Sequence, residues 1–372
     1  MIRFWKLSVA FLFIVAGNAS ADSGGSESPV LRVGVIQSLS GIAAEDGSTV
    51  VQALELAAQE INNTEKIKVE LLVEDDATDP RKSVSAYQKL RELNVHAIIG
   101  PTWSFTVNSV LPLAARDKLV LINSSTLPEC LELGKSSGFG FSTAVKVTEH
   151  ARVFGEYLKK YPAKSVVLFF TSNSWGHAQR DAYKKVLSEQ KVVLADEIES
   201  TNFDLNDWMA LLPRVKALNS DLWLLLLNKA DVDTIIRRAS EFHGSARLFA
   251  SYHLADLLRN KKDLQLFDNV CFPYPGEQLQ SETEFAGKFR EKYHEAPKVF
   301  ADNSYDTLFL LHRAFAMSQS NGLSLQDSLH AIKLRGVVGE YQFRESESFS
   351  IGKASLMCGS KLLKSEAAGV TL

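Results

Sequence analysis

Apolar segments with the length of a β-strand alternate with amphipathic segments of helical length along most of this chain, and the series runs twice. Most of the strand-like segments are continuous apolar runs, which are typical of strands buried inside a parallel sheet. They lie at residues 31–37, 67–73, 95–99 and 119–122 in the first series, and at residues 165–170, 192–198, 222–227 and 247–250 in the second. Such alternation implies parallel sheets with helices on both faces. We therefore predict an α/β fold with two doubly wound lobes.

The size and charge of the chain narrow its possible partners. With 372 residues, of which 45% are hydrophobic, it is long enough to form two cores. Its net charge is −3, and Lys and Arg form no basic stripe, so nucleic acid is not an expected partner. The eight His residues show no H-x-x-x-H or H-x-H spacing, so we expect no metal site and no cofactor.

The first residues have the three parts of a secretory signal peptide. Arg3 and Lys6 flank an apolar run at residues 7–16, and Ala19-Ser20-Ala21 provides a small-residue cleavage site. An uncleaved membrane anchor is the alternative, but the run is shorter than the ~20 apolar residues that a membrane span needs. We expect cleavage after Ala21, removal of residues 1–21 and export to the periplasm.

Three cysteines, Cys130, Cys271 and Cys358, are too few for a disulfide scaffold and leave at least one thiol unpaired. In an oxidising compartment a Cys271–Cys358 bridge is one alternative. The favoured expectation is three separate buried thiols.

Four polar segments follow strand-like segments at the points where ligands bind to open α/β sheets. They lie at residues 38–41, 102–106, 123–126 and 171–176. In the second, Trp103, Ser104 and Phe105 stand at the start of a helix, where free N–H groups and the helix dipole favour an anion. The alternative is an ordinary N-cap at Ser104 with a staple contact. Hydroxyls and amides in all four segments could bind a carboxylate, with Trp103 and Trp175 as apolar cover.

A catalytic nucleophile is not expected. Residues 134–138 match G-x-S-x-G, but a nucleophile elbow needs a strand before the motif and a helix after it. Here a polar loop precedes the motif and a strand-like segment follows. We therefore predict no catalytic residues and no enzymatic function.

Four stretches of the sequence resemble the periplasmic Leu/Ile/Val-binding protein family, the type I solute-binding proteins of ABC transporters. They read VGVIQSLSG, LLVEDDATDPRKSVSAYQKL, AIIGPTWSFTVNSVLPLAARDKLVLINSSTLPE and NSWGHAQRDAYKKVL. The resemblance implies two Rossmann-like lobes joined by a three-crossing hinge, with crossings near Thr143, Pro273 and Val338. The first lobe would comprise residues 29–143 plus 274–337, and the second residues 144–273 plus 338–372.

The same resemblance implies a ligand site in the cleft between the lobes. Ser104 would bind the ligand carboxylate with its hydroxyl and amide, between Trp103 and Phe105 on one jaw. Ser124, Ser125 and Thr126 would continue this shell. Trp175 would close from the second lobe in place of a family aromatic, usually Tyr, and Phe300 would contact an apolar part of the ligand.

The sequence departs from the family pattern at several expected site positions. His253 stands where the family often has an acid that holds the ligand ammonium, Asn228 replaces an aromatic, and Asp46 replaces a tyrosine. We therefore expect a ligand that keeps a carboxylate but need not carry an α-ammonium. Asp46 or Asp231 could supply the missing acid, although Asp231 is more simply read as a helix cap.

The favoured function is capture of a small carboxylate or amino-acid-like ligand by a monomer that delivers it to ABC permease subunits. The alternative is a periplasmic ligand sensor for a membrane receptor or regulator. An exported hydrolase is the third and least favoured reading.

Overall fold

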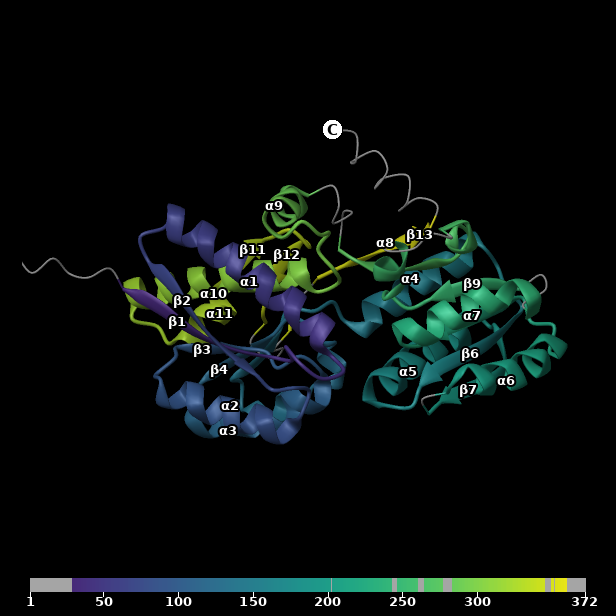
Figure 1. Cartoon of the computed structure of the whole chain (residues 1–372), viewed down its shortest axis with the longest axis horizontal. Coiled ribbons are helices and arrows are strands. Elements are labelled where there is room, and N and C mark those ends of the chain that lie inside the picture. The colour runs from purple at the N-terminus through teal and green to yellow at the C-terminus, as the bar shows by residue number, and fades with distance from the viewer. Residues whose placement is uncertain are drawn as a thin grey trace, which may run out of the picture.

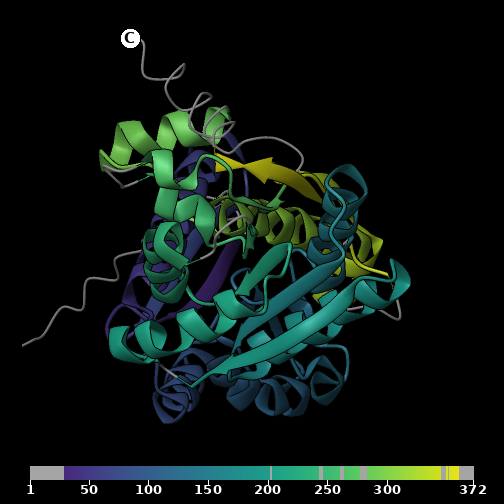
Figure 2. The ribbon, with the colours of Figure 1, turned by 90° about the vertical axis from the view of Figure 1, so that its right-hand side faces the viewer.

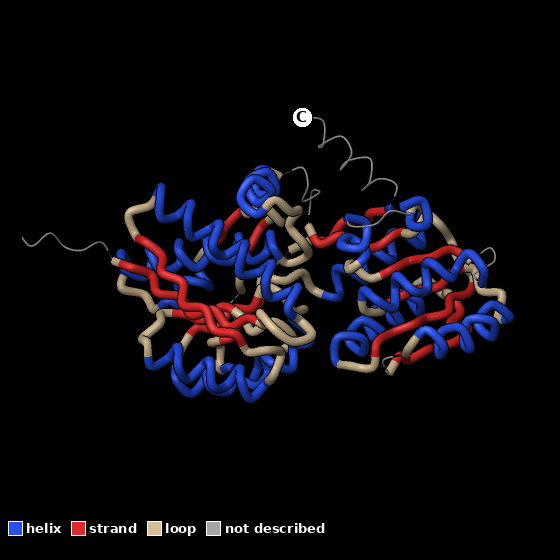
Figure 3. Tube along the Cα trace, viewed as in Figure 1, coloured by secondary structure: helices blue, strands red, loops and turns tan. Residues whose placement is uncertain are grey.

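The computed structural model describes residues 29–201, 203–242, 246–259, 264–276, 283–344, 349–350 and 352–359. These residues form two lobes that lie side by side, each with a central sheet between helices (Figure 1, Figure 3). The signal peptide expected at residues 1–21 lies outside the described residues. No helix in the described ranges is both long enough and apolar enough to cross a membrane.

The first lobe contains a five-stranded parallel sheet with the strand order β2-β1-β3-β4-β5. The strands are β1 (Val30–Gln37), β2 (Lys68–Asp75), β3 (Ala97–Ile99), β4 (Val120–Asn123) and β5 (Gly140–Ser142). The helices that pack in this lobe are α1 (Ala44–Thr64), α2 (Pro80–Glu92), α3 (Ser104–Asp117), α9 (Glu284–Tyr293), α10 (Ala301–Asn321) and α11 (Leu325–Ala331). Helices α2 and α3 cover one face of the sheet, and α1 and α10 cover the other (Figure 1).

Strand β1 shows why both faces are covered. Val33 and Val35 pack in the same core as Val50 of α1, whereas Ile36 packs in the core that holds Leu90 of α2. Because side chains alternate along a strand, an apolar run needs a core on each side. This arrangement confirms the α/β fold with doubly wound sheets.

The second lobe contains a six-stranded sheet with the strand order β13-β10-β9-β8-β6-β7 (Figure 2). The strands are β6 (Ser165–Thr171), β7 (Val193–Ser200), β8 (Leu222–Leu226), β9 (Arg247–Ala250), β10 (Cys271–Pro275) and β13 (Ala354–Cys358). The helices are α4 (Val147–Lys160), α5 (Ser174–Glu189), α6 (Leu205–Ala217), α7 (Lys229–Phe242) and α8 (Leu254–Arg259). Neighbouring strands are parallel except β13, which pairs antiparallel to β10.

The chain passes between the two sheets three times. It leaves the first sheet after β5, returns to the first lobe after β10, and enters the second sheet again at β13. Before the last passage it forms a small antiparallel pair, β11 (Lys333–Arg335) with β12 (Glu340–Gln342). Short 3-10 helices lie at Pro128–Cys130, Leu133–Ser136 and Leu264–Phe267. The residue limits of the lobes and the crossings predicted near Thr143, Pro273 and Val338 stay predictions.

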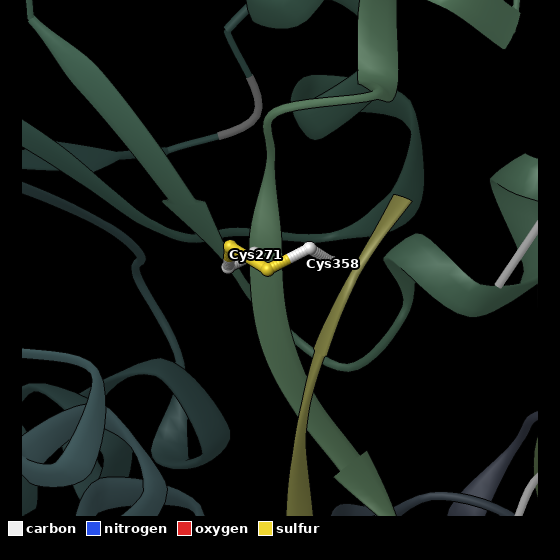
Figure 4. Close-up of a disulfide and its surroundings, with 2 residues drawn as sticks. All are labelled: Cys271 and Cys358. Carbon is white, nitrogen blue, oxygen red and sulfur yellow. A yellow bond between two sulfur atoms is a disulfide. The ribbon is translucent and has the colours of Figure 1, made fainter. Parts of the chain in front are cut away.

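The expectation of three separate thiols is wrong for two of the cysteines. Cys271 and Cys358 form a disulfide with an S–S distance of 2.07 Å (Figure 4). Strand β13 returns antiparallel to β10 and places Cys358 directly opposite Cys271, although 87 positions separate them in the sequence. Cys130 is free and buried.

Candidate functional site

Loops that follow strands of the first lobe touch loops that follow strands of the second. Ser104, after β3, has its Oγ 3.1 Å from the Oγ of Ser174, after β6. Glu45, after β1, pairs through Oε2 with Lys229 Nζ, after β8, over 3.0 Å. Ligands of open α/β sheets bind beyond the carboxyl ends of the strands. We therefore treat this contact region, defined by these four residues and their neighbours, as the interlobe site.

Residues 103–105 form the start of α3 at the interlobe site. The helix begins at Ser104, with Trp103 in the N-cap position and no side-chain cap, so the alternative expectation of an N-cap at Ser104 is wrong. The Ser104 hydroxyl bonds to Ser174 instead, and Trp103 Nε1 donates to Asp46 Oδ2 over 3.0 Å. Phe105 is 45% exposed and lies edge-on to Trp103. Trp103 and Ser104 thus lie within the site, and Phe105 lies at its exposed rim.

The hydroxyl groups that follow β4 form hydrogen bonds to other groups of the protein. Ser125 Oγ and Thr126 Oγ1 both donate to the carbonyl oxygen of Thr102, at 2.9 and 2.7 Å. Ser124 Oγ lies 2.8 Å from Ser304 Oγ, and both residues are fully buried. In this arrangement Ser125 and Thr126 brace the turn that leads into α3, and Ser124 contacts α10. Their role as ligand contacts stays a prediction.

Aromatic rings from both lobes form a cluster beside Ser174. Trp175 Nε1 donates to Tyr252 Oη over 3.1 Å, and the Trp175 and His253 rings have centroids 5.4 Å apart. Phe300, which precedes α10, meets the Tyr252 ring edge-on at 6.0 Å. Sequence reasoning had identified Trp175, His253 and Phe300 but not Tyr252. The signal for Tyr252 was its place directly after the β9 segment and before His253.

Asp46 and His253 interact electrostatically across the two lobes, and both are partly buried. Burial raises the pKa of Asp46, although His253 and the Trp103 N–H favour its charged form. Burial also lowers the pKa of His253, against the attraction of Asp46 and Asp256. The structure therefore places the carboxyl groups of Asp46 and Asp256 within electrostatic range of His253, which stands where the family acid was expected.

Asp231 is not a helix cap, and whether it supplies the missing acid stays a prediction. Helix α7 begins at Lys229, and Asn228 Oδ1 accepts from the Asp231 amide over 3.0 Å, so Asn228 is the capping residue. Asp231 accepts from Trp208 Nε1 over 3.0 Å and from Asn228 Nδ2 over 2.8 Å, and it is buried. Both side chains are engaged within the second lobe. A ligand contact by Asn228 stays a prediction.

A small ion cluster joins the lobes at the rim of the interlobe site. Glu45 pairs with Lys229 across the lobes and with Lys298 Nζ, each over 3.0 Å. Burial works to raise the pKa of Glu45, but hydrogen bonds from the two lysines outweigh it and lower this pKa. One carboxylate, that of Glu45, is therefore shared by the two ammonium groups of Lys229 and Lys298.

The G-x-S-x-G match at residues 134–138 does not form a nucleophile elbow, because strand β5 and not a helix follows it. Ser136, the serine of the G-x-S-x-G match, is fully buried in the 3-10 helix Leu133–Ser136. Its Oγ donates to the Leu133 carbonyl oxygen and accepts from the Gly140 amide. Among the described residues, no group of three or more His, Cys, Asp and Glu could hold a metal ion.

Comparison with known proteins points to one family. A family model described as periplasmic binding protein matches residues 30–357. Leu/Ile/Val-binding protein homolog 1 of Brucella suis is 25% identical over 92% of this chain and 91% of its own length. An uncharacterized protein of Methanocaldococcus jannaschii is 24% identical over 77% of this chain and 73% of its own length.

Solved structures share the fold at low identity. The branched-chain amino acid transporter substrate-binding protein LivJ of Streptococcus pneumoniae, in complex with isoleucine, has a TM-score of 0.75 and 20% identity, over 89% of this chain and 97% of its own. A solute-binding protein of an ABC transporter from Rhodopseudomonas palustris, in complex with 3,4-dihydroxybenzoic acid, has a TM-score of 0.77 and 18% identity, over 88% of this chain and 93% of its own.

Proposed function

Because the chain belongs to the periplasmic binding protein family, we propose that it captures a small carboxylate or amino-acid-like ligand at the interlobe site and delivers it to ABC permease subunits. The family membership agrees with the resemblance predicted from the sequence. One observation carries the proposal: Ser104, at the first position of α3, meets Ser174 of the other lobe.

The N-terminus of α3 provides the chemistry for a carboxylate. Its first amide groups have no partner within the helix, and the helix dipole favours negative charge there. The Ser104 hydroxyl is a donor that can exchange its Ser174 partner for a carboxylate oxygen. Trp103 and Trp175 flank this position with apolar surface, while their indole N–H groups donate to Asp46 and Tyr252. A carboxylate is also common to the isoleucine and 3,4-dihydroxybenzoic acid bound by the two solved structures.

The carboxyl of Asp46 determines whether the interlobe site accepts a ligand that carries an ammonium group. Its carboxyl lies beside Trp103 and opposite His253, so it can hold an ammonium that the expected family acid would have held. Without a ligand, the Asp46 carboxyl accepts from Trp103 Nε1 and interacts electrostatically with His253. Amino acids and carboxylates without nitrogen are therefore both candidate ligands, and a direct comparison of their affinities distinguishes the two classes.

We expect Ser104→Ala to weaken carboxylate binding about 10- to 150-fold. This factor corresponds to the ~1.5–3 kcal/mol of binding free energy that a charge-assisted hydrogen bond contributes. A thermal-shift panel followed by calorimetry would compare leucine, its keto acid 4-methyl-2-oxopentanoate, benzoate and succinate. Bound ligand raises the melting temperature by mass action.

Ser109→Ala is the matched control, because Ser109 lies on the same helix and donates to Thr106 and Pro80 carbonyl oxygens away from the interlobe site. It should bind as wild type does. Wild-type affinity in Ser104→Ala, or no carboxylate that stabilises the wild-type protein, would contradict the proposal.

We also propose that the protein is exported and that its signal peptide is removed after Ala21. The intact mass of the product from a periplasmic extract should correspond to a chain that begins at Asp22, and light scattering on the same sample should give a monomer. A mass that retains residues 1–21, or recovery only with the membrane fraction, would rule out this processing.

A further inference from the structure

A small cavity lies behind the aromatic cluster, where the segments that connect the lobes come together. Its lining includes His150 of α4, Tyr252 and Phe300 of the aromatic cluster, Asp302 of α10 and Leu127, which follows β4. We call it the hinge cavity. Tyr252 and Phe300 line it and also belong to the interlobe site, so the two spaces share a wall. The cavity can hold a group about the size of one water molecule.

His150 is the unusual member of this lining. It is 1% exposed, and neither of its ring nitrogens has a hydrogen-bond partner among the described residues. Its ring lies 5.1 Å from that of Tyr252. Burial lowers the pKa of His150 to about 3, so its imidazole is neutral at pH 7. A neutral imidazole has one nitrogen that donates and one that accepts, and burial without partners is unfavourable for both.

We propose that the hinge cavity is a subsite for a hydroxyl group at the far end of the bound ligand, recognised by His150. The inference rests on the proposed function, because Ser104 would hold the carboxylate at the other end. The substrate class would then be small carboxylic acids that carry an alcohol or phenol group.

The chemistry of the cavity favours a hydroxyl over other groups. A hydroxyl can donate to one ring nitrogen of His150 or accept from the other, and it is small enough for the space. A charged group would lose its hydration against mostly apolar walls, which include Leu127, Val299 and Phe300. A carboxylate would also be repelled by the buried Asp302 carboxyl. A methyl group would leave His150 without a partner.

The test measures the affinity of ligand pairs that differ by one hydroxyl: 4-hydroxybenzoate and benzoate, tyrosine and phenylalanine, threonine and valine. Wild type should bind the hydroxylated member of at least one pair roughly 3- to 10-fold more tightly. His150→Phe, which keeps a ring but no hydrogen-bonding group, should reduce that ratio to within about two-fold while its affinity for the hydroxyl-free member is kept or increased.

His177→Phe is the control. His177 lies at the partly exposed start of α5, away from the cavity, and it pairs with Glu199 of β7. Its hydroxyl preference should equal that of wild type. Equal affinities within every pair for wild type, or a preference that persists in His150→Phe, would overturn the subsite and leave the proposed function standing. If no carboxylate binds at all, both fail.

A second measurement does not depend on how well a variant folds. In the wild-type protein labelled with ¹⁵N-histidine, the hydroxylated member of the preferred pair should shift the ring nitrogen resonances of His150, and the hydroxyl-free member should not. Resonances that respond equally to both members would overturn the proposal.

Discussion

Acidification from pH 7 to pH 5 should lower the free energy of unfolding of the wild-type protein by about 2 kcal/mol more than that of His150→Phe. The cause is the difference between the pKa of His150 in the folded protein, about 3, and the ordinary histidine value of ~6.5 in the unfolded chain. Below pH ~6.5 the unfolded chain takes up a proton that the folded protein cannot accept. Stability is therefore present above this pH and is lost as the pH falls.

Other groups titrate too, which is why the comparison is between wild type and one variant. His253 interacts electrostatically with His150, and Asp306 of α10, which accepts from the Val337 and Val338 amides, has its pKa raised by burial to about 7. A carboxyl group with a raised pKa acts in the opposite direction, because the folded protein then binds the proton more tightly. Both proteins contain these groups, so the difference between their pH profiles isolates His150.

Denaturant unfolding followed by tryptophan fluorescence at pH 7, 6 and 5 gives both profiles. At pH 7 the His150→Phe variant should be as stable as wild type or more stable, because it replaces a buried unpaired polar group by an apolar one. Parallel profiles for wild type and His150→Phe would show that His150 is protonated in the folded protein or has an unseen partner.

The fold could be predicted because its determinants are local in the sequence. Asp79 accepts from the amides of Arg81 and Lys82 and Pro80 begins α2, as their order predicts. The continuous apolar runs of β6 and β8 are buried along almost their whole length, which is what a doubly covered parallel sheet requires. Repetition of the strand–helix pattern was enough to indicate two lobes.

Features that depend on distant segments could not be predicted in the same way. His150 lies within a polar stretch, Thr148-Glu149-His150, that reads as a solvated first turn, and it is buried only because Tyr252 and the start of α10 close over it. Helix α4 begins at Val147, and Glu129, 18 positions earlier in the sequence, accepts from the amides of Val147 and Thr148. Those contacts join residues that lie far apart in the sequence, so no local pattern indicates them.

The candidate site shows the same division. Family resemblance identified Ser104 and Trp175, and the structure brings their surroundings together through Ser174. The family resemblance could not show that the hydroxyls of Ser125 and Thr126 donate to the Thr102 carbonyl oxygen, because hydrogen-bond partners depend on the folded backbone. The position of Asp46 opposite His253 also depends on how the two lobes meet.

Removal of the Cys271–Cys358 bridge should produce the largest loss of stability of any change considered. The bridge closes a loop across 87 positions, and the chain-entropy model gives about 4 to 5 kcal/mol for a loop of this length. Strand β13 is at the edge of its sheet and pairs only with β10 in the described residues. Without the bridge, the antiparallel pairing with β10, the packing of Ala354 and Met357 in the core, and the hydrogen bond from Arg152 to the Ala354 carbonyl oxygen would have to hold this strand.

The double variant Cys271→Ala/Cys358→Ala should therefore unfold at a much lower denaturant concentration than wild type, and the amides of β13 should exchange with solvent faster than those of β8. Cys130→Ala is the matched control, since it removes a buried cysteine without a bridge and should cost about 1 kcal/mol. Reduction of the wild-type protein by dithiothreitol should reproduce the double variant, because the same constraint on the unfolded chain is lost. If the double variant were no less stable than Cys130→Ala, the pairing of β13 with β10 would be sufficient by itself, and the bridge would contribute nothing to the stability of the second lobe.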